Sequence, residues 1–308
     1  MTPVTVRVLP QRTWLERTRA HERRVDAWLS PALERRARGE AHPVEDFLFD
    51  YYPYPPSRLR RWSPGLGVVL QGRAAEVFRD RRGFVVSPEA AHVDPVISPA
   101  QSSRLRWVRD LLLRTSARAA VVGCFGLHEW AMVYRLDRAE RRHPQVALRV
   151  PDQVVEATVE QVGLRCTHFD ALRFFSPEAR PRNVSTLSRE TQPEHEQPGC
   201  LHATMDLYKY CMWLQPLLPA ELSADAFELA RDARALDMAA SPYDLAAYGL
   251  TPVPVESAAG RAEYKHRQAE VAARGQELRS RILAAVEAVV AHVRSSTRIR
   301  ETPTARHR

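Results

Sequence analysis

Histidines and carboxylates recur together in three short stretches of this 308-residue chain. The residues are His128 with Glu129, His168 with Asp170, and His202 with Asp206 and the downstream Lys209. Imidazole and carboxylate groups are common ligands of divalent metals and common general acids and bases. If the three stretches meet in the fold, their histidines and acids are able to bind one divalent metal, iron or zinc.

The stretch over residues 199–213 has the spacing of a helix. His202, Asp206, Lys209 and Trp213 are four, three and four positions apart, which places them along one stripe of a helix. Two interpretations stay open: a solvated face with an ordinary Asp–Lys pair, or a reactive helix at the edge of a pocket. Lys209 is one of only two lysines in the chain, and an ammonium, unlike a guanidinium, can lose its proton.

The other two stretches support acid–base chemistry as well. Glu129 lies among bulky apolar residues, so burial would raise the pKa of its carboxyl group, unless a buried arginine pairs with it. Residues 164–175 are apolar and aromatic, and we predict a strand there. On a strand, His168 and Asp170 point to the same face.

The positive charge lies at the two ends of the chain. The net charge is +8, with 12 Arg against 8 acidic residues over 1–61 and 5 Arg against one Glu over 294–308, so the middle is neutral. A DNA partner would therefore bind through the basic ends. Aromatic and arginine side chains near the N-terminus are the candidate DNA contacts, namely Tyr52, Tyr54, Arg58, Arg60, Arg61 and Trp62.

The hydrophobic periodicity predicts a mainly helical fold of the α+β class, with a helical core and a small sheet. Helices are predicted over residues 11–38, 102–116, 151–163, 201–214, 223–239 and 260–293, with a short one after residue 43. Strands are predicted at 67–70 and 83–86. Residues 119–123 are either a buried strand or a continuing apolar segment, and residues 128–135 are either a strand or a helix. The expected organisation is one domain over 1–293 and a basic disordered tail over 294–308.

Several protein classes are disfavoured by missing patterns. No GxGxxG follows a strand, so a Rossmann fold is not expected, and no internal repeat indicates a helical-repeat fold. The chain has neither an apolar run of membrane-spanning length nor a signal-peptide pattern at its N-terminus. We therefore expect a cytoplasmic protein with no membrane partner.

Six segments carry a resemblance to a known family. They are residues 42–49 (HPVEDFLF), 123–135 (GCFGLHEWAMVYR), 167–175 (THFDALRFF), 179–183 (ARPRN), 196–210 (EQPGCLH followed by MDLYKY) and 241–245 (SPYDL). Together they resemble a family of actinobacterial proteins labelled 3-methyladenine DNA glycosylase, over roughly residues 10–290. The resemblance implies removal of alkylated purines from DNA by hydrolysis of the N-glycosidic bond, with no cofactor required.

Two functions therefore stay open. In a glycosylase, Glu129, Asp170 or Asp206 would be the carboxylate that assists hydrolysis after the base is flipped out. The alternative is a metal-dependent oxygenase or hydrolase acting on a small molecule. Its ligands would be His128, His168 and His202, together with one or more of the same acids.

Overall fold

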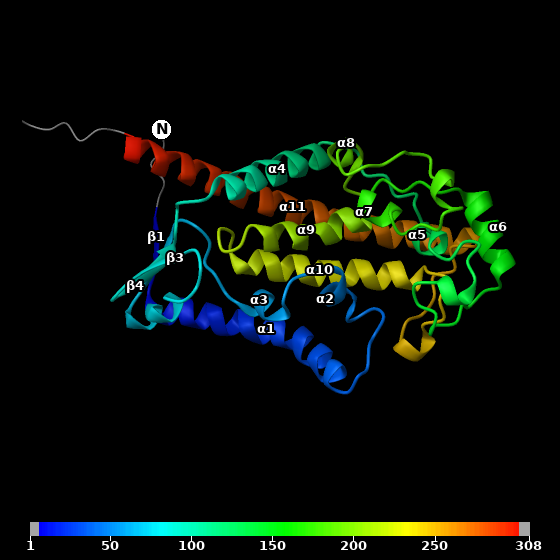
Figure 1. The fold of residues 1–308 in the computed structure, drawn as a ribbon, viewed down its shortest axis with the longest axis horizontal. Helices are drawn as coiled ribbons and strands as arrows, with labels where there is room; N and C mark the ends of the chain where they lie inside the picture. Colours follow the sequence, from blue (N-terminus) through cyan, green and yellow to red (C-terminus); the bar gives the residue numbers. More distant parts are fainter. Residues whose placement is uncertain (1–5, 302–308) are drawn as a thin grey trace, which may run out of the picture.

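Five long helices form the body of the protein in the computed structural model (Figure 1). The structure describes the backbone of residues 6–301 and the side chains of residues 6–293. The long helices are α1 (Gln11–Ala37), α4 (Pro99–Ser116), α9 (Leu201–Trp213), α10 (Ala220–Ala239) and α11 (Ala258–Glu301). Helices α9 and α10 pack together at the centre, with α11 and α4 on one side and α1 on the other. The predicted mainly helical fold is confirmed.

A small sheet closes one end of this helical body (Figure 1). Its strands are β1 (Arg7–Leu9), β2 (Val68–Gln71), β3 (Phe84–Ser87) and β4 (Ala90–Val93), in the order β1-β2-β4-β3. Strands β1 and β2 are parallel, and the other two pairings are antiparallel. The sheet packs on the start of α1 through a separate apolar cluster that includes Trp14, Trp62 and Phe78.

Shorter helices gather at the other end, where α9 begins and α10 ends (Figure 1). They include α5 (Leu127–Ala131), α6 (Asp152–Val162) and α7 (Phe169–Leu172). Three more lie along the flanks, namely α2 (Phe47–Tyr51), α3 (Pro56–Arg60) and α8 (Gln192–His195). The three stretches that carry histidines and acids all belong to this irregular end of the molecule.

Helix α9 is buried on nearly every side, because other helices surround it. The interpretation of its polar stripe as a solvated face is therefore wrong. Close packing is possible because Gly275 of α11 has no side chain: a Cβ there would lie 2.7 Å from Oγ1 of Thr204. The chain enters α5 by a sharp turn at Phe125 and Gly126, both in the left-handed region (φ 49° and 65°). That turn directs His128 and Glu129 inward.

Most predicted helices are confirmed, but several boundaries and one strand differ from the prediction. The α4 helix begins three residues earlier than predicted, at Pro99, and the side chain of Ser98 caps it. Residues 119–123 form no regular element. Residues 164–175 contain helix α7 instead of a strand, because Leu164 pairs with Asn183 in a single bridge and no neighbouring strand continues the ladder.

The C-terminal helix is longer than expected. Helix α11 continues to Glu301, past the predicted end at residue 293 and into the segment expected to be disordered. The remainder of that segment, residues 302–308, lies outside the described residues. Within residues 6–301, none of the helices combines the length and the apolar composition that crossing a bilayer requires.

A buried ion pair before α2 gives the fold a pH-dependent contribution. The carboxylate of Asp46 accepts hydrogen bonds from Nε of Arg35 (3.0 Å) and from the backbone amide of His42 (2.9 Å). Burial acts to raise the pKa of Asp46, but the hydrogen bonds from Arg35 and from the backbone of His42, together with the charge of Arg35, outweigh burial, and the pKa is lowered. Asp46→Asn should cost about 2 kcal/mol at pH 7. This cost should shrink as the pH falls from about 4 through the lowered pKa of Asp46. The wild-type carboxylate then becomes protonated and loses its charge, so it resembles the uncharged side chain of the variant.

Urea unfolding across this pH range measures the effect, and Asp50→Asn is the matched control. Asp50 pairs with Arg36 in the same region, but its side chain is 67% exposed. An exposed pair contributes little, so the control should change the free energy of unfolding by less than about 0.5 kcal/mol. Equal effects of the two variants would contradict the assignment.

Candidate functional site

The structure brings the three histidine stretches together at the start of α9. The ring centroids of His128 and His202 are 4.4 Å apart, and those of His202 and His168 are 5.4 Å apart. His128 belongs to α5, His168 directly precedes α7, and His202 is the second residue of α9. All three side chains are buried.

The first ligand group consists of His128, His202 and Asp237, which lies near the end of α10. Each residue offers one donor atom, and the three atoms lie within 4.8 Å of one another. The carboxylate of Asp237 lies 2.8 and 3.0 Å from Nε2 of His128. Arg234, one turn earlier on α10, contacts Oδ2 of Asp237 (3.1 Å) and Oε1 of Glu129 (2.5 Å).

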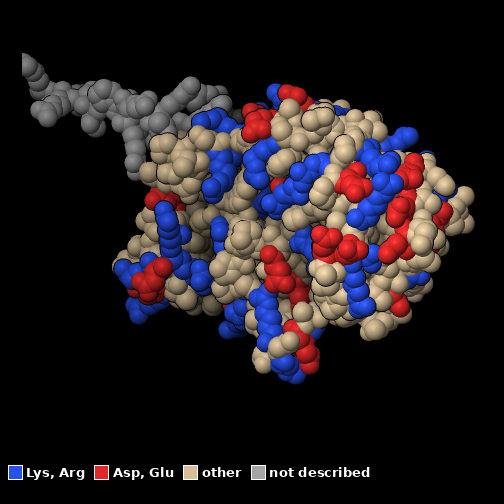
Figure 2. All heavy atoms as spheres, turned by 45° about the vertical axis from the view of Figure 1, so that its right-hand side comes forward, with Lys and Arg blue, Asp and Glu red and all other residues tan. Residues whose placement is uncertain are grey.

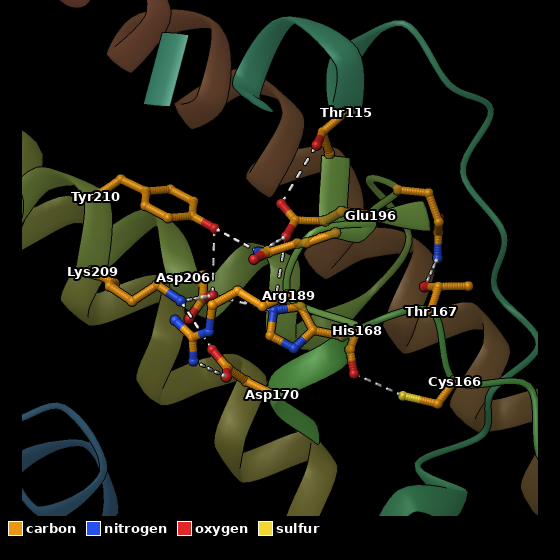
Figure 3. A network of polar contacts seen from close by, with 12 residues as sticks. Thr115, Cys166, Thr167, His168, Asp170, Arg189, Glu196, Asp206, Lys209 and Tyr210 are labelled. Atoms are coloured by element: carbon orange, nitrogen blue, oxygen red, sulfur yellow. Dashed lines mark hydrogen bonds and ion pairs between the residues drawn. The ribbon is translucent and has the colours of Figure 1, made fainter. Parts of the chain in front are cut away.

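The second ligand group consists of His168, Glu196 and Asp206, and Figure 3 shows them converging from three elements. Nε2 of His168 lies 3.2 Å from Oδ2 of Asp206 and 3.9 Å from Oε2 of Glu196. The donor atoms again lie within 4.8 Å of one another, and each side chain is about 1% exposed. Two atoms bound to one ion at about 2.1 Å lie at most about 4.2 Å apart, so only a small closure is needed.

These distances divide the predicted site in two. The sequence predicted that the three histidines could serve a single ion. In the structure, His128 and His202 belong to one ligand group and His168 belongs to the other. The two groups meet where the ring of His168, from the second group, stacks on the ring of His202, from the first, at an interplanar angle of 29°.

Lys209 and Asp170 complete the second group (Figure 3). Nζ of Lys209 contacts Oδ2 of Asp206 and lies 3.3 Å from Oδ2 of Asp170. Asp170 also faces the exposed Arg189 at 3.5 Å. The predicted Asp–Lys pair on α9 is thus present, although it is almost fully buried.

Glu129 does not behave as a raised-pKa acid. Burial acts to raise its pKa, but the charge and hydrogen bond of Arg234, together with the charge of His128, outweigh burial, and the pKa is lowered to about 2. The alternative interpretation, a pair with a buried arginine, is confirmed. Glu129 is therefore ionised at neutral pH and is a poor general acid.

Burial and charge also move the pKa of other groups in the site. The pKa of His202 lies well below its usual value, because burial and the charge of His128 both disfavour the imidazolium. Burial raises the pKa of Glu196. Burial opposes the charged forms of Asp206 and Lys209, but their mutual attraction lowers the pKa of the acid and raises that of the amine. A neutral imidazole at His202 is the form that binds metal.

Two small cavities meet at His202. The first, of about 20 Å³, is lined by His128, the thiols of three cysteines and apolar side chains such as Leu127 and Phe175. The second, of about 10 Å³, is lined by Glu129 and Arg234 and by the rings of residues 47, 51 and 174. A space of 10–20 Å³ holds about one molecule the size of water. A molecule about the size of water can therefore lie against His128 and His202.

The buried carboxylates of the site outnumber the arginine and lysine side chains that pair with them. Glu129, Glu196, Asp206 and Asp237 are all about 2% exposed or less. Apart from the histidines, only Arg234 and Lys209 form ion pairs with them among the described side chains. An uncompensated buried carboxylate is costly, so the excess must be balanced by protons, by bound cations or by the buried guanidinium of Arg279, whose charge interacts with Glu196.

Three residues of the site were not among the sequence candidates: Arg234, Asp237 and Glu196. The first two carried a readable signal. On α10 they continue the stripe of Phe227 and Ala230 at steps of four and three, so two charges lie on an apolar face. Glu196 had no such signal, because it lies in a polar segment between α8 and α9.

The six candidate DNA contacts are mostly engaged within the protein. Tyr52 is 3% exposed and donates to Oδ1 of Asp206 (2.8 Å), and Trp62 is 1% exposed. Tyr54 packs against Tyr208, Arg58 donates to a backbone carbonyl, and Arg60 pairs with Asp26. Arg61 is exposed. As placed, the rings of Tyr52 and Trp62 are not available to stack on a base.

The arginines of the N-terminal region are also largely paired. Arg17, Arg24, Arg35 and Arg36 each form an ion pair with an acidic side chain. On the face drawn in Figure 2, basic and acidic side chains are interspersed. The side chains of residues 294–308, the other basic end, lie outside the described residues.

Comparison of the chain with protein-family models, with curated proteins and with the solved structures found no match. The geometry of the two ligand groups is therefore the basis for assigning a function to the protein.

Proposed function

We propose that the protein is a metal-dependent oxygenase that acts on a small molecule, with ferrous iron held by His128, His202 and Asp237. The observation that carries the proposal is that this donor set is buried beside small cavities: His128 and His202 line the first, and His202 also lines the second. The ion is thereby accessible to a small reactant and shielded from bulk water.

The choice of iron follows from the donor set. Two histidines and one carboxylate with open positions are typical of non-haem Fe(II) oxygenases. Zinc hydrolases use similar donors, so the surroundings must decide between the two. The first cavity is lined mainly by apolar and thiol side chains, including those of Leu164 and Cys166. Such a lining suits dioxygen better than the polar carbonyl group of a hydrolase substrate.

The side chains around the donor set position the ligands. Arg234 bridges Glu129 and Asp237, so the carboxylate of Asp237 is held beside Nε2 of His128. Hydrogen-bonded partners of this kind orient metal ligands and tune the affinity for the ion. When bound, ferrous iron supplies the electrons and the coordination position that dioxygen requires.

Dioxygen consumption tests the proposal. Metal-free protein is loaded with Fe(II) without oxygen, freed of excess ion and mixed with air-saturated buffer. We expect the bound Fe(II) to be oxidised, with dioxygen as the electron acceptor, faster than the same concentration of Fe(II) in buffer. Retention of Zn(II) in preference to Fe(II), together with no dioxygen uptake, would instead favour the hydrolase.

The glycosylase function implied by the family resemblance stays a prediction, and a separate assay tests it. Alkylated DNA is incubated with the metal-free protein, and released methylated purines are quantified beside an active glycosylase. We expect release at background, because the aromatic side chains predicted to contact DNA are packed in the core. Release well above background would overturn our proposal.

A further inference from the structure

The second ligand group, formed by His168, Glu196 and Asp206, plays no part in the proposal above, yet it has the composition of a metal site. It brings one imidazole and two carboxylates to within 4.8 Å in a fully buried setting. Glu196 comes from the segment after α8, His168 from the start of α7 and Asp206 from the middle of α9 (Figure 3).

We propose that this group binds a second divalent cation, so that the protein carries a two-metal centre. This inference rests on the proposed function for the first ion and adds a separate site to it. A donor set with two carboxylates is harder than the first one and suits iron or manganese. Helical proteins that bind two metals between their helices use comparable sets of histidines and carboxylates.

The carboxylate of Glu196 is oriented by two neutral hydrogen-bonding side chains. Its Oε2 accepts a hydrogen bond from Nε2 of Gln192 (2.7 Å), and its Oε1 faces the hydroxyl of Thr115 at 3.4 Å. Its one ion-pairing partner among the described side chains is His168, at 3.9 Å. A buried acid oriented by neutral donors is what a metal ligand requires.

The carboxylate of Asp206 is oriented in a similar way. Its Oδ1 accepts from the hydroxyl of Tyr52 (2.8 Å), which turns Oδ2 towards Nε2 of His168 (3.2 Å). Nδ1 of His168 is buried and has no hydrogen-bond partner among the described residues. The imidazole is therefore fixed by its stacking on His202 and by its contacts with the two acids, which are the other ligands of the proposed ion.

Lys209 occupies part of the place that an ion would take. Its ammonium contacts Asp206, but it also lies 3.3 Å from Oδ2 of Asp170. Asp170 provides a second acceptor for the ammonium, so a lysine that turns fully towards Asp170 would free Oδ2 of Asp206 for an ion. The lysine thus supplies one positive charge until a cation binds, and Asp170 retains it afterwards.

The number of ions per chain tests this inference. Metal-free protein is saturated with Mn(II), freed of excess ion and analysed for metal. We expect two ions per chain in the wild type and one in Glu196→Gln, which keeps the size of the side chain but removes its charge. The matched control is Glu194→Gln, because Glu194 lies two residues away on α8 and is exposed; it should retain both ions.

Magnetic resonance of the Mn(II)-loaded wild type gives a readout that needs no variant. Two neighbouring ions produce a spin-coupled spectrum, whereas one ion gives the spectrum of isolated Mn(II). One ion per chain with an uncoupled spectrum, unchanged in Glu196→Gln, would overturn the second site and leave the proposed function standing. Absence of bound metal in the wild type would overturn both.

Discussion

Replacing His202 with alanine is expected to lower the affinity of the first ligand group for a divalent ion by roughly 100-fold or more, since even the loss of a residue that only orients a ligand costs about 10–100-fold. His202 supplies one of only three protein donors there, and it also lines both cavities. Co(II), which air does not oxidise readily, is a convenient substitute for Fe(II). Competition with a chromogenic chelator measures the affinity, and the variant should also lose Fe(II)-dependent dioxygen uptake.

The matched control for this change is His266→Ala. His266 lies on α11 with its side chain 77% exposed, and Glu270 is its ion-pairing partner among the described side chains. It should keep the wild-type Co(II) affinity. Thermal unfolding of all three proteins without metal separates loss of a ligand from loss of the fold. A folded His202→Ala protein with wild-type Co(II) affinity would show that the first ligand group does not bind the ion.

The second large effect concerns Arg234. Its guanidinium is 2% exposed and bridges Glu129 and Asp237, which are buried as well. Arg234→Met preserves much of the side-chain volume but leaves two buried carboxylates without their cation. Breaking a buried ion pair from one side costs about 3–5 kcal/mol, so we expect the metal-free variant to lose that much free energy of unfolding.

Arg231→Met is the control, because Arg231 lies one turn earlier on α10. It pairs with Glu45, whose side chain is 43% exposed, so solvent can replace the lost contact. We expect this control to lose less than about 1 kcal/mol in the same urea titration. If Arg234→Met were as mild as Arg231→Met, the charge balance that we assign to the first group would be incorrect.

Much of the helical architecture was predictable from the sequence. The apolar periods of α1, α9, α10 and α11 exceed three turns, and residues three and four apart in such a period must share a buried face. The segment that became α7 was mispredicted, because its aromatic and apolar residues suit a strand as well as a short buried helix. Pairing with a neighbouring strand would have decided between strand and helix. Among the described residues, this segment forms only the single bridge between Leu164 and Asn183.

The candidate site was likewise predictable from the sequence only in part. Local sequence determined that His128, His168 and His202 each lie near an acid, and helical spacing placed Asp206 and Lys209 on one stripe of α9. It could not show which acid serves which imidazole. His128 pairs with Asp237, 109 residues away, instead of with the adjacent Glu129, which is held by Arg234.

The spacing of residues along one element is local, so the sequence by itself determined the elements and the types of donor group that they carry. The pairing of those donors depends on how α5, α7 and the segment before α9 pack around α9 and α10. Burial then decided their charges, because a low-dielectric interior amplifies each contact with Arg234 or Lys209. Only the tertiary structure could divide three similar stretches into two distinct ligand groups.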